Sequence, residues 1–112
     1  MPYLTLRHSD NLKIDFIPFF KKAHSVLCDV INVKPASCSS LVTTHQQYLL
    51  GDGMSSNVFI HLDVLVKPKK FTDQLNTISE ILLNELNDYL NSHDVACHKA
   101  SVNVFEANHF SN

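Results

Sequence analysis

The order in which two hydrophobic periodicities follow one another constrains the fold of this chain more than any other feature. Two segments repeat apolar residues at three- and four-residue steps, which predicts two amphipathic helices. Alternate apolar positions over 58–66 predict a strand, and shorter β-type segments lie at 3–7, 39–44 and 100–104. The helical positions are Phe16, Phe19, Phe20, Ala23, Val26, Leu27, Val30 and Ile31, then Leu75, Ile78, Leu82, Leu86 and Tyr89.

The predicted order is therefore strand–helix–strand, repeated once. The turn Gly51-Asp52-Gly53 holds both glycines of the chain and separates two halves, at about 1–56 and 57–112. A right-handed crossover in each half makes its two strands parallel and places both helices on one face of a shared sheet. We expect a single α+β domain over 1–112, a two-layer sandwich of fused βαβ units that oligomerises.

Composition excludes several classes of function. The chain has 112 residues, 45% of them hydrophobic, and a formal net charge of -2, which does not favour nucleic acid or an acidic membrane as partner. The N-terminus does not resemble a signal peptide, and no apolar stretch approaches the ~20 residues of a spanning helix. Three cysteines, Cys28, Cys38 and Cys97, are an odd number without paired spacing. We expect free thiols and a cytoplasmic location.

Several features together resemble one enzyme family. Pro2 follows the initiator Met directly before a short strand, which runs into Ser9-Asp10-Asn11. Pro18 enters the first helix, and Asp52-Gly53 precedes the strand-forming run 58–62. In this order over nearly the whole chain, the features resemble the 5-carboxymethyl-2-hydroxymuconate isomerases of the tautomerase superfamily. The resemblance implies a homotrimer, an active site around the N-terminal proline near a subunit interface, and ketonisation of a small acidic dienol in aromatic catabolism.

Pro2 is the candidate catalytic residue, acting as general acid and base without a metal or organic cofactor. An N-terminal amine has a reference pKa of roughly 8, near the range that suits a general base, and an apolar pocket lowers the pKa of prolyl nitrogen further. This chemistry requires loss of Met1, because otherwise the Pro2 nitrogen is a tertiary amide. We expect removal, since Pro is a small second residue. The alternative is that Pro2 only begins an edge strand.

Substrate binding departs from the family pattern. The family places one arginine where this chain has Ser39 and another where it has Lys70, and Arg7 falls where a glutamate is usual. An arginine fork grips a carboxylate better than either replacement. Lys70 belongs to a lysine-rich turn before the second predicted helix, where an anion can bind. We take Ser39 and Lys70 as the candidate substrate-binding residues, with a solvated surface as the alternative for Lys70.

Other polar groups carry weaker hypotheses. The run His93-Asp94-Val95-Ala96-Cys97-His98 lacks the spacing of established zinc sites, so we predict no metal there. Cys97 beside a histidine could indicate nucleophilic catalysis, although no third group orients the pair. His61 reads as a structural or surface histidine. The alternatives to a muconate isomerase are a tautomerase for a less acidic substrate and a trimeric binding or structural protein without catalysis.

Overall fold

The computed structural model describes residues 2–66, 74–95 and 100–106, and the elements within them follow the predicted order. The elements are β1 (Tyr3–Ser9), α1 (Ile17–Ile31), the 3-10 turn η1 (Pro35–Ser37), β2 (Ser39–His45), β3 (Ile60–Val66), α2 (Leu75–Ser92) and β4 (Ala100–Glu106). Two strand–helix–strand units therefore build the molecule.

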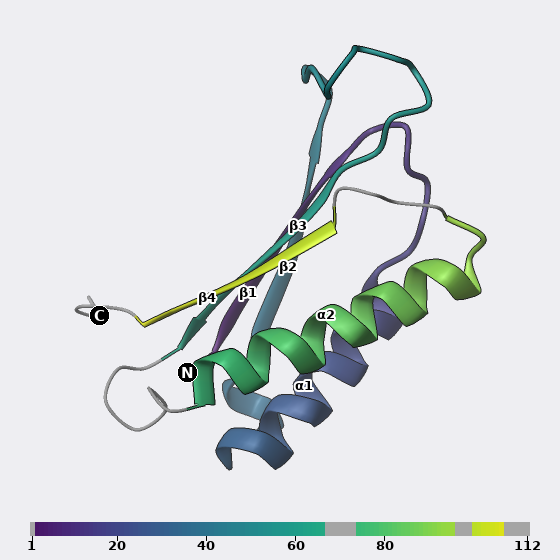
Figure 1. Ribbon diagram of the computed structural model, residues 1–112. Coiled ribbons are helices and arrows are strands. Elements are labelled where there is room, and N and C mark those ends of the chain that lie inside the picture. Colours follow the sequence, from purple (N-terminus) through teal and green to yellow (C-terminus); the bar gives the residue numbers. More distant parts are fainter. Residues whose placement is uncertain (1, 67–73, 96–99, 107–112) are drawn as a thin grey trace.

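The four strands form one sheet in the order β2-β1-β3-β4. Strands β1 and β2 are parallel, and so are β3 and β4, whereas the central pair β1 and β3 is antiparallel. Figure 1 shows both helices on the same side of the sheet, with α1 and α2 lying next to each other. The two-layer α+β architecture predicted from the sequence is confirmed.

The hydrophobic core lies between the sheet and the helices, because alternate positions of β1 and β3 point toward the apolar stripes of α1 and α2. Burying one such side chain contributes about 1.5–3 kcal/mol. At the end of α2, Leu90 is buried while the predicted Tyr89 is only partly so, and the Tyr89 hydroxyl donates to the Asp15 carbonyl. The buried set in these elements is Leu4, Leu6, Phe19, Phe20, Ala23, Leu27, Ile31, Ile60, Leu62, Val64, Val66, Ile78, Leu82, Leu86 and Leu90.

The first helix begins and ends where its sequence permits. The Asp15 carboxylate accepts a hydrogen bond from the Ile17 N–H at 2.9 Å, and Pro18 occupies the first turn, where a missing N–H costs nothing. Asn32 ends the helix with φ of 54°, a left-handed conformation that asparagine tolerates. Thr72, a residue before the second predicted helix that suits an N-cap, lies outside the described residues.

The motif Ser9-Asp10-Asn11 ties the first half of the chain to the segment between β2 and β3. The buried Ser9 hydroxyl accepts the Phe59 N–H at 3.2 Å, and the Asp10 carboxylate accepts the Tyr48 hydroxyl at 2.8 Å. The Asn11 amide donates to the carbonyls of Ser55 and Asn57. These bonds also explain why β3 begins at Ile60 and not at the expected residue 58. The motif has a structural role here.

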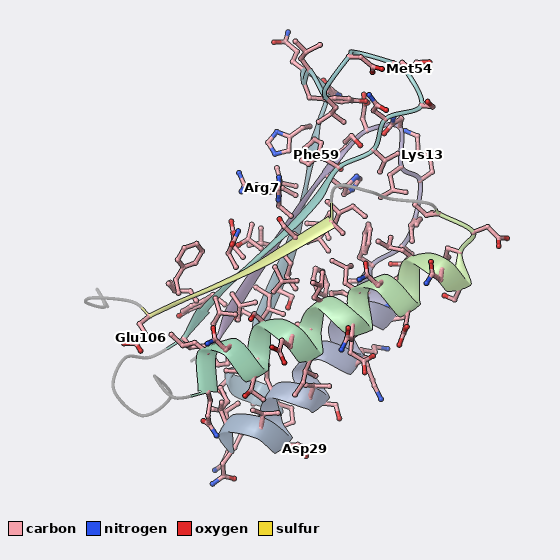
Figure 2. All side chains as sticks on the ribbon, viewed as in Figure 1. Arg7, Lys13, Asp29, Met54, Phe59 and Glu106 are labelled. Atoms are coloured by element: carbon pink, nitrogen blue, oxygen red, sulfur yellow. The ribbon has the colours of Figure 1, made fainter. Side chains whose placement is uncertain are left out.

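The sheet face away from the helices is uncovered among the described residues. Its exposed apolar side chains are Tyr3 at 40%, Leu41 at 56% and Phe105 at 49% exposure. Arg7 projects from the same face (Figure 2) and pairs with Asp63 at 3.2 Å, while its buried Nε has no hydrogen-bond partner among the described residues. Neither helix in the described part of the chain is long and apolar enough to cross a membrane.

Candidate active site

Pro2 lies at the entrance to β1, in the middle of the sheet. It is buried, and its carbonyl accepts the Ser39 N–H at 3.1 Å. The next residue, Tyr3, pairs with Ser39 on β2 and with Leu65 on β3. The structure therefore places the buried Pro2 beside the first residue of β2 and the end of β3.

Of the two residues predicted to bind substrate, the structure places one. Ser39 adjoins Pro2 through the backbone bond given above, and its side chain is exposed. Lys70 lies outside the described residues, four positions after Val66, where β3 ends. The described part of this site thus offers a neutral hydroxyl beside Pro2 and no arginine.

Sequence reasoning missed the proximity of two thiols, Cys28 on α1 and Cys38 just before β2. Burial, followed by the neighbouring Cys28 thiol, raises the pKa of the Cys38 thiol above its ordinary value. A raised pKa keeps the thiol protonated and a weak nucleophile at neutral pH. Both cysteines are free, in agreement with the expectation for these two, and Cys97 lies outside the described residues. Their proximity depends on η1, a turn that the sequence pattern did not predict.

Two histidines near the sheet have structural hydrogen bonds. His24 on α1 meets the Ser40 hydroxyl on β2, with Nε2 and Oγ 2.6 Å apart, and burial lowers the pKa of His24 below its ordinary value. His61 on β3 shares a hydrogen bond with the Ser101 hydroxyl on β4, across the parallel pair. This bond is in line with the structural alternative for His61, whose side chain is half-buried.

The histidine-rich run after α2 is only partly described. The His93 ring donates from Nδ1 to the Tyr89 carbonyl at 2.9 Å, so it ends the helix. Cys97 and His98 lie outside the described residues. Within residues 2–66, 74–95 and 100–106, no group of three histidine, cysteine or acidic side chains is arranged to hold a metal ion.

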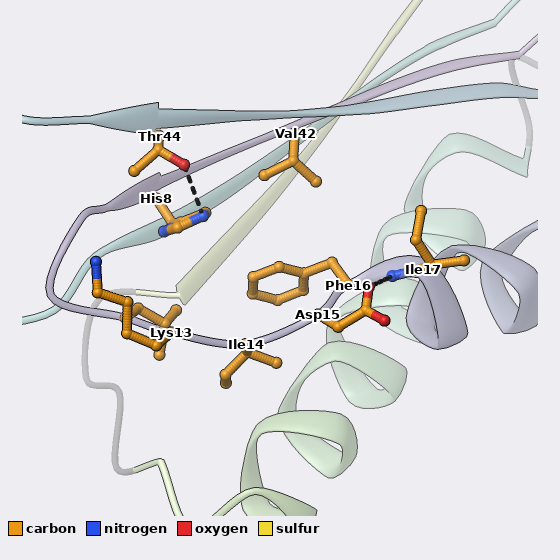
Figure 3. A pocket seen from close by; sticks show the side chains of 9 residues that line it. His8, Lys13, Ile14, Asp15, Phe16, Ile17, Val42 and Thr44 are labelled. Atoms are coloured by element: carbon orange, nitrogen blue, oxygen red, sulfur yellow. Dashed lines mark hydrogen bonds between the residues drawn. The ribbon is translucent and has the colours of Figure 1, made fainter.

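A cavity of about 560 Å³ lies at the opposite end of β1 from Pro2. His8 forms part of its wall and is only 5% exposed. Its Nδ1 donates to the Ser9 carbonyl at 2.7 Å, and Nε2 meets the Thr44 hydroxyl at 3.3 Å. Since a carbonyl can only accept, the hydrogen of a neutral His8 ring belongs on Nδ1. The lining residues are His8, Leu12, Lys13, Ile14, Asp15, Phe16, Ile17, Val42 and Thr44 (Figure 3).

This cavity and the Pro2 site are separate. Pro2 and His8 are six residue steps apart along the strand, a distance of roughly 20 Å at about 3.3 Å per residue. No side chain that lines the cavity belongs to the surroundings of Pro2. Sequence reasoning missed the cavity because it forms only when the segment 10–16 folds back against β2.

Comparison with known proteins identifies the fold. No protein-family model matches the sequence, and no curated protein matches it. Solved structures do. A 5-carboxymethyl-2-hydroxymuconate isomerase from Deinococcus radiodurans R1 superposes with a TM-score of 0.82 at 21% identity, covering 99% of this chain and 88% of that one. A 5-carboxymethyl-2-hydroxymuconate delta-isomerase gives a TM-score of 0.84 at 12% identity, covering 100% and 86%.

A third similar structure is a fused 4-OT described as a symmetric trimer, with a TM-score of 0.65, 11% identity, and coverage of 94% of this chain and 85% of that one. At these identities the likeness establishes the fold. The chain has the tautomerase fold, and in particular the arrangement seen in 5-carboxymethyl-2-hydroxymuconate isomerases. The resemblance inferred from the sequence is confirmed at the level of fold.

Proposed function

We propose that this protein is a cofactor-independent tautomerase, acting on a small acidic dienol with Pro2 as general acid and base. The observation that carries the proposal is the burial of Pro2 at the end of a central strand, in the fold of known isomerases. 5-Carboxymethyl-2-hydroxymuconate is the first substrate to test, because two of the similar structures are isomerases of that compound.

The chemistry requires one basic nitrogen and no oxidant. The lone pair of the Pro2 amine removes the hydroxyl proton of the dienol, and the electrons of that O–H bond form the C=O bond. The conjugated double bonds shift, and the proton held on Pro2 is delivered to a carbon of the chain. Burial favours this role because it penalises the ammonium form and keeps the amine free near neutral pH.

The neutral residue beside Pro2 favours a second candidate substrate class. Ser39 donates one hydrogen bond and carries no charge, whereas a substrate with several carboxylates needs cationic partners. Lys70 is our candidate for one carboxylate. A dienol with a single carboxylate, such as phenylenolpyruvate, would need no second cation. We therefore propose tautomerisation of a less acidic enol as the alternative activity.

We also propose that the protein is a homotrimer, in which the open face of the sheet packs against other copies. Support comes from the exposed apolar side chains of that face and from the buried Arg7 Nε, which has no hydrogen-bond partner among the described residues, since a buried polar group normally has one. Phe105→Glu should lower the sedimentation coefficient to that of a monomer. The control Lys22→Glu, which changes charge on the exposed side of α1, should leave it unchanged. A wild-type monomer at micromolar concentration would contradict the proposal.

Activity assays and covalent labelling together test the role of Pro2. 2-Oxo-3-pentynoate is a conjugated alkyne to which a free secondary amine adds, increasing the mass by one reagent molecule without loss of atoms. We expect loss of tautomerase activity in proportion to labelling, with the added mass on the N-terminal peptide. Labelling confined to cysteine peptides, or activity on neither candidate substrate with Met1 absent, would favour a binding or structural protein.

A further inference from the structure

We propose that the cavity at the His8 end of β1 binds a small carboxylate with an aromatic or other apolar body. This site is separate from Pro2 and is formed by β1, β2 and the segment before α1. Its volume of about 560 Å³ falls in the range of ~300–1,000 Å³ typical of small-molecule sites.

The polar groups of the cavity gather at one end. Figure 3 shows the Lys13 ammonium, the His8 ring and the Thr44 hydroxyl at that end. Lys13 supplies the positive charge. The Thr44 hydroxyl donates to the unprotonated His8 Nε2 over 3.3 Å, a long hydrogen bond, so a carboxylate oxygen can compete for that hydrogen. This end therefore fits an anion.

The remainder of the wall is apolar. Phe16, Ile14 and Val42 occupy the middle of the cavity, and Ile17 lies at the far end (Figure 3). The Phe16 ring packs against the His8 ring, with the centroids 5.4 Å apart, and Phe16 is buried. An aromatic ring placed here would replace water against this surface.

The single acidic group of the lining does not oppose an anion at the polar end. Asp15 lies beside Ile17, toward the end of the cavity away from Lys13 (Figure 3), and its Oδ1 accepts the Ile17 N–H. The Lys13 ammonium would repel a cationic ligand, and it would add no ion pair to the binding of an uncharged one. Charge and shape thus select an apolar carboxylate.

The experiment titrates 2-naphthylacetate into 15N-labelled protein and follows the amide resonances. A ligand of this size is expected to bind with a Kd of about 1 mM. Shifts should cluster at residues 12–17 and 42–44. The uncharged 2-naphthylacetamide should bind about fivefold more weakly, which corresponds to the loss of one partly exposed ion pair.

Two charge-matched variants locate the anion end. Lys13→Gln should weaken the binding of 2-naphthylacetate about fivefold and leave the affinity for 2-naphthylacetamide unchanged. Lys21→Gln, on the exposed surface of α1, should change neither affinity. Val42→Trp fills the cavity from a site that is 39% exposed, so the protein should fold and lose both ligands. Binding is expected whether or not the protein has tautomerase activity.

Several results would overturn the proposal. These are equal affinity for the acid and its amide, equal effects of the two lysine variants, no shifts up to the solubility of the probe, or shifts centred on Pro2 and Ser39. The proposal would also be overturned if the resonances of residues 12–17 shifted with protein concentration alone and the probe reversed those shifts. That result would assign the cavity to a second copy of the chain.

Discussion

The two ends of β1 carry different kinds of site. At the Pro2 end, the one residue that we propose as catalytic is buried, and the described residues around it include no cationic side chain that could hold an acidic substrate beside Ser39. At the His8 end, the chain forms an open cavity of about 560 Å³ that has both a cation and an apolar wall. The comparison shows that the described residues of one chain form the lining of the second site, whereas the catalytic site that we propose includes Lys70, which lies outside them.

The largest effect should come from a substitution in the middle of β1, because it destabilises the strand that carries both sites. Leu6 lies midway along β1 and is fully buried between sheet and helices. Leu6→Ala should lower the free energy of unfolding by about 2–5 kcal/mol, because a cavity remains in the core. Urea unfolding monitored by circular dichroism measures this. The matched control is Leu41→Ala on the open face, measured on dilute monomer, and it should lower the free energy of unfolding far less. Equal decreases for the two variants would contradict the assigned core.

A charge restored at the Pro2 end should sharpen the difference between the ends. Ser39→Arg places a guanidinium beside Pro2, so kcat/KM for a dienol with several carboxylates should rise about tenfold, as expected for one charge-assisted pair. The value for phenylenolpyruvate should change less. Ser25→Arg, on the exposed side of α1, controls for net charge. Equal gains from both variants would remove Ser39 from the substrate site.

The smallest effect concerns pH and the His24–Ser40 contact, which joins α1 to β2. Burial lowers the pKa of folded His24 below its ordinary value of 6.5, so the unfolded chain binds more protons between the two values. Stability from this group is therefore complete above about pH 6.5 and decreases as pH falls through that window. The free energy of unfolding should decrease less between pH 7.5 and 5.5 in His24→Gln. An unchanged slope would contradict burial as the cause.

Periodicity predicted the fold because the core depends on it directly. The alternation over 58–66 and the two helical stripes determined which faces are buried, and the repeated order determined the parallel strand pairs. Details set by side-chain bonds between distant segments were not predictable. Residue 58 was expected to begin β3, but Ser9 bonds to Phe59 and delays it.

The two sites also differ in how far the sequence could predict them. The position of Pro2 beside Ser39 could be predicted, since both begin parallel strands that a short helical crossover joins. The cavity could not, because His8 follows the predicted strand 3–7 and no sequence pattern indicates that the segment 10–16 folds against it. The proximity of Cys28 and Cys38 likewise depends on the turn between α1 and β2. Local patterns predict elements, whereas pockets require knowledge of how loops return to the sheet.

The most direct test of Pro2 as acid and base compares one protein before and after removal of an N-terminal extension. With a cleavable extension, the Pro2 nitrogen is an amide without basicity; after cleavage that leaves Pro2 first, it is a free secondary amine. Intact mass confirms each form, and kcat/KM is measured for 5-carboxymethyl-2-hydroxymuconate and phenylenolpyruvate. We predict an increase of about 10²–10⁴-fold on cleavage for at least one substrate. Equal activity in the two forms would contradict Pro2 catalysis.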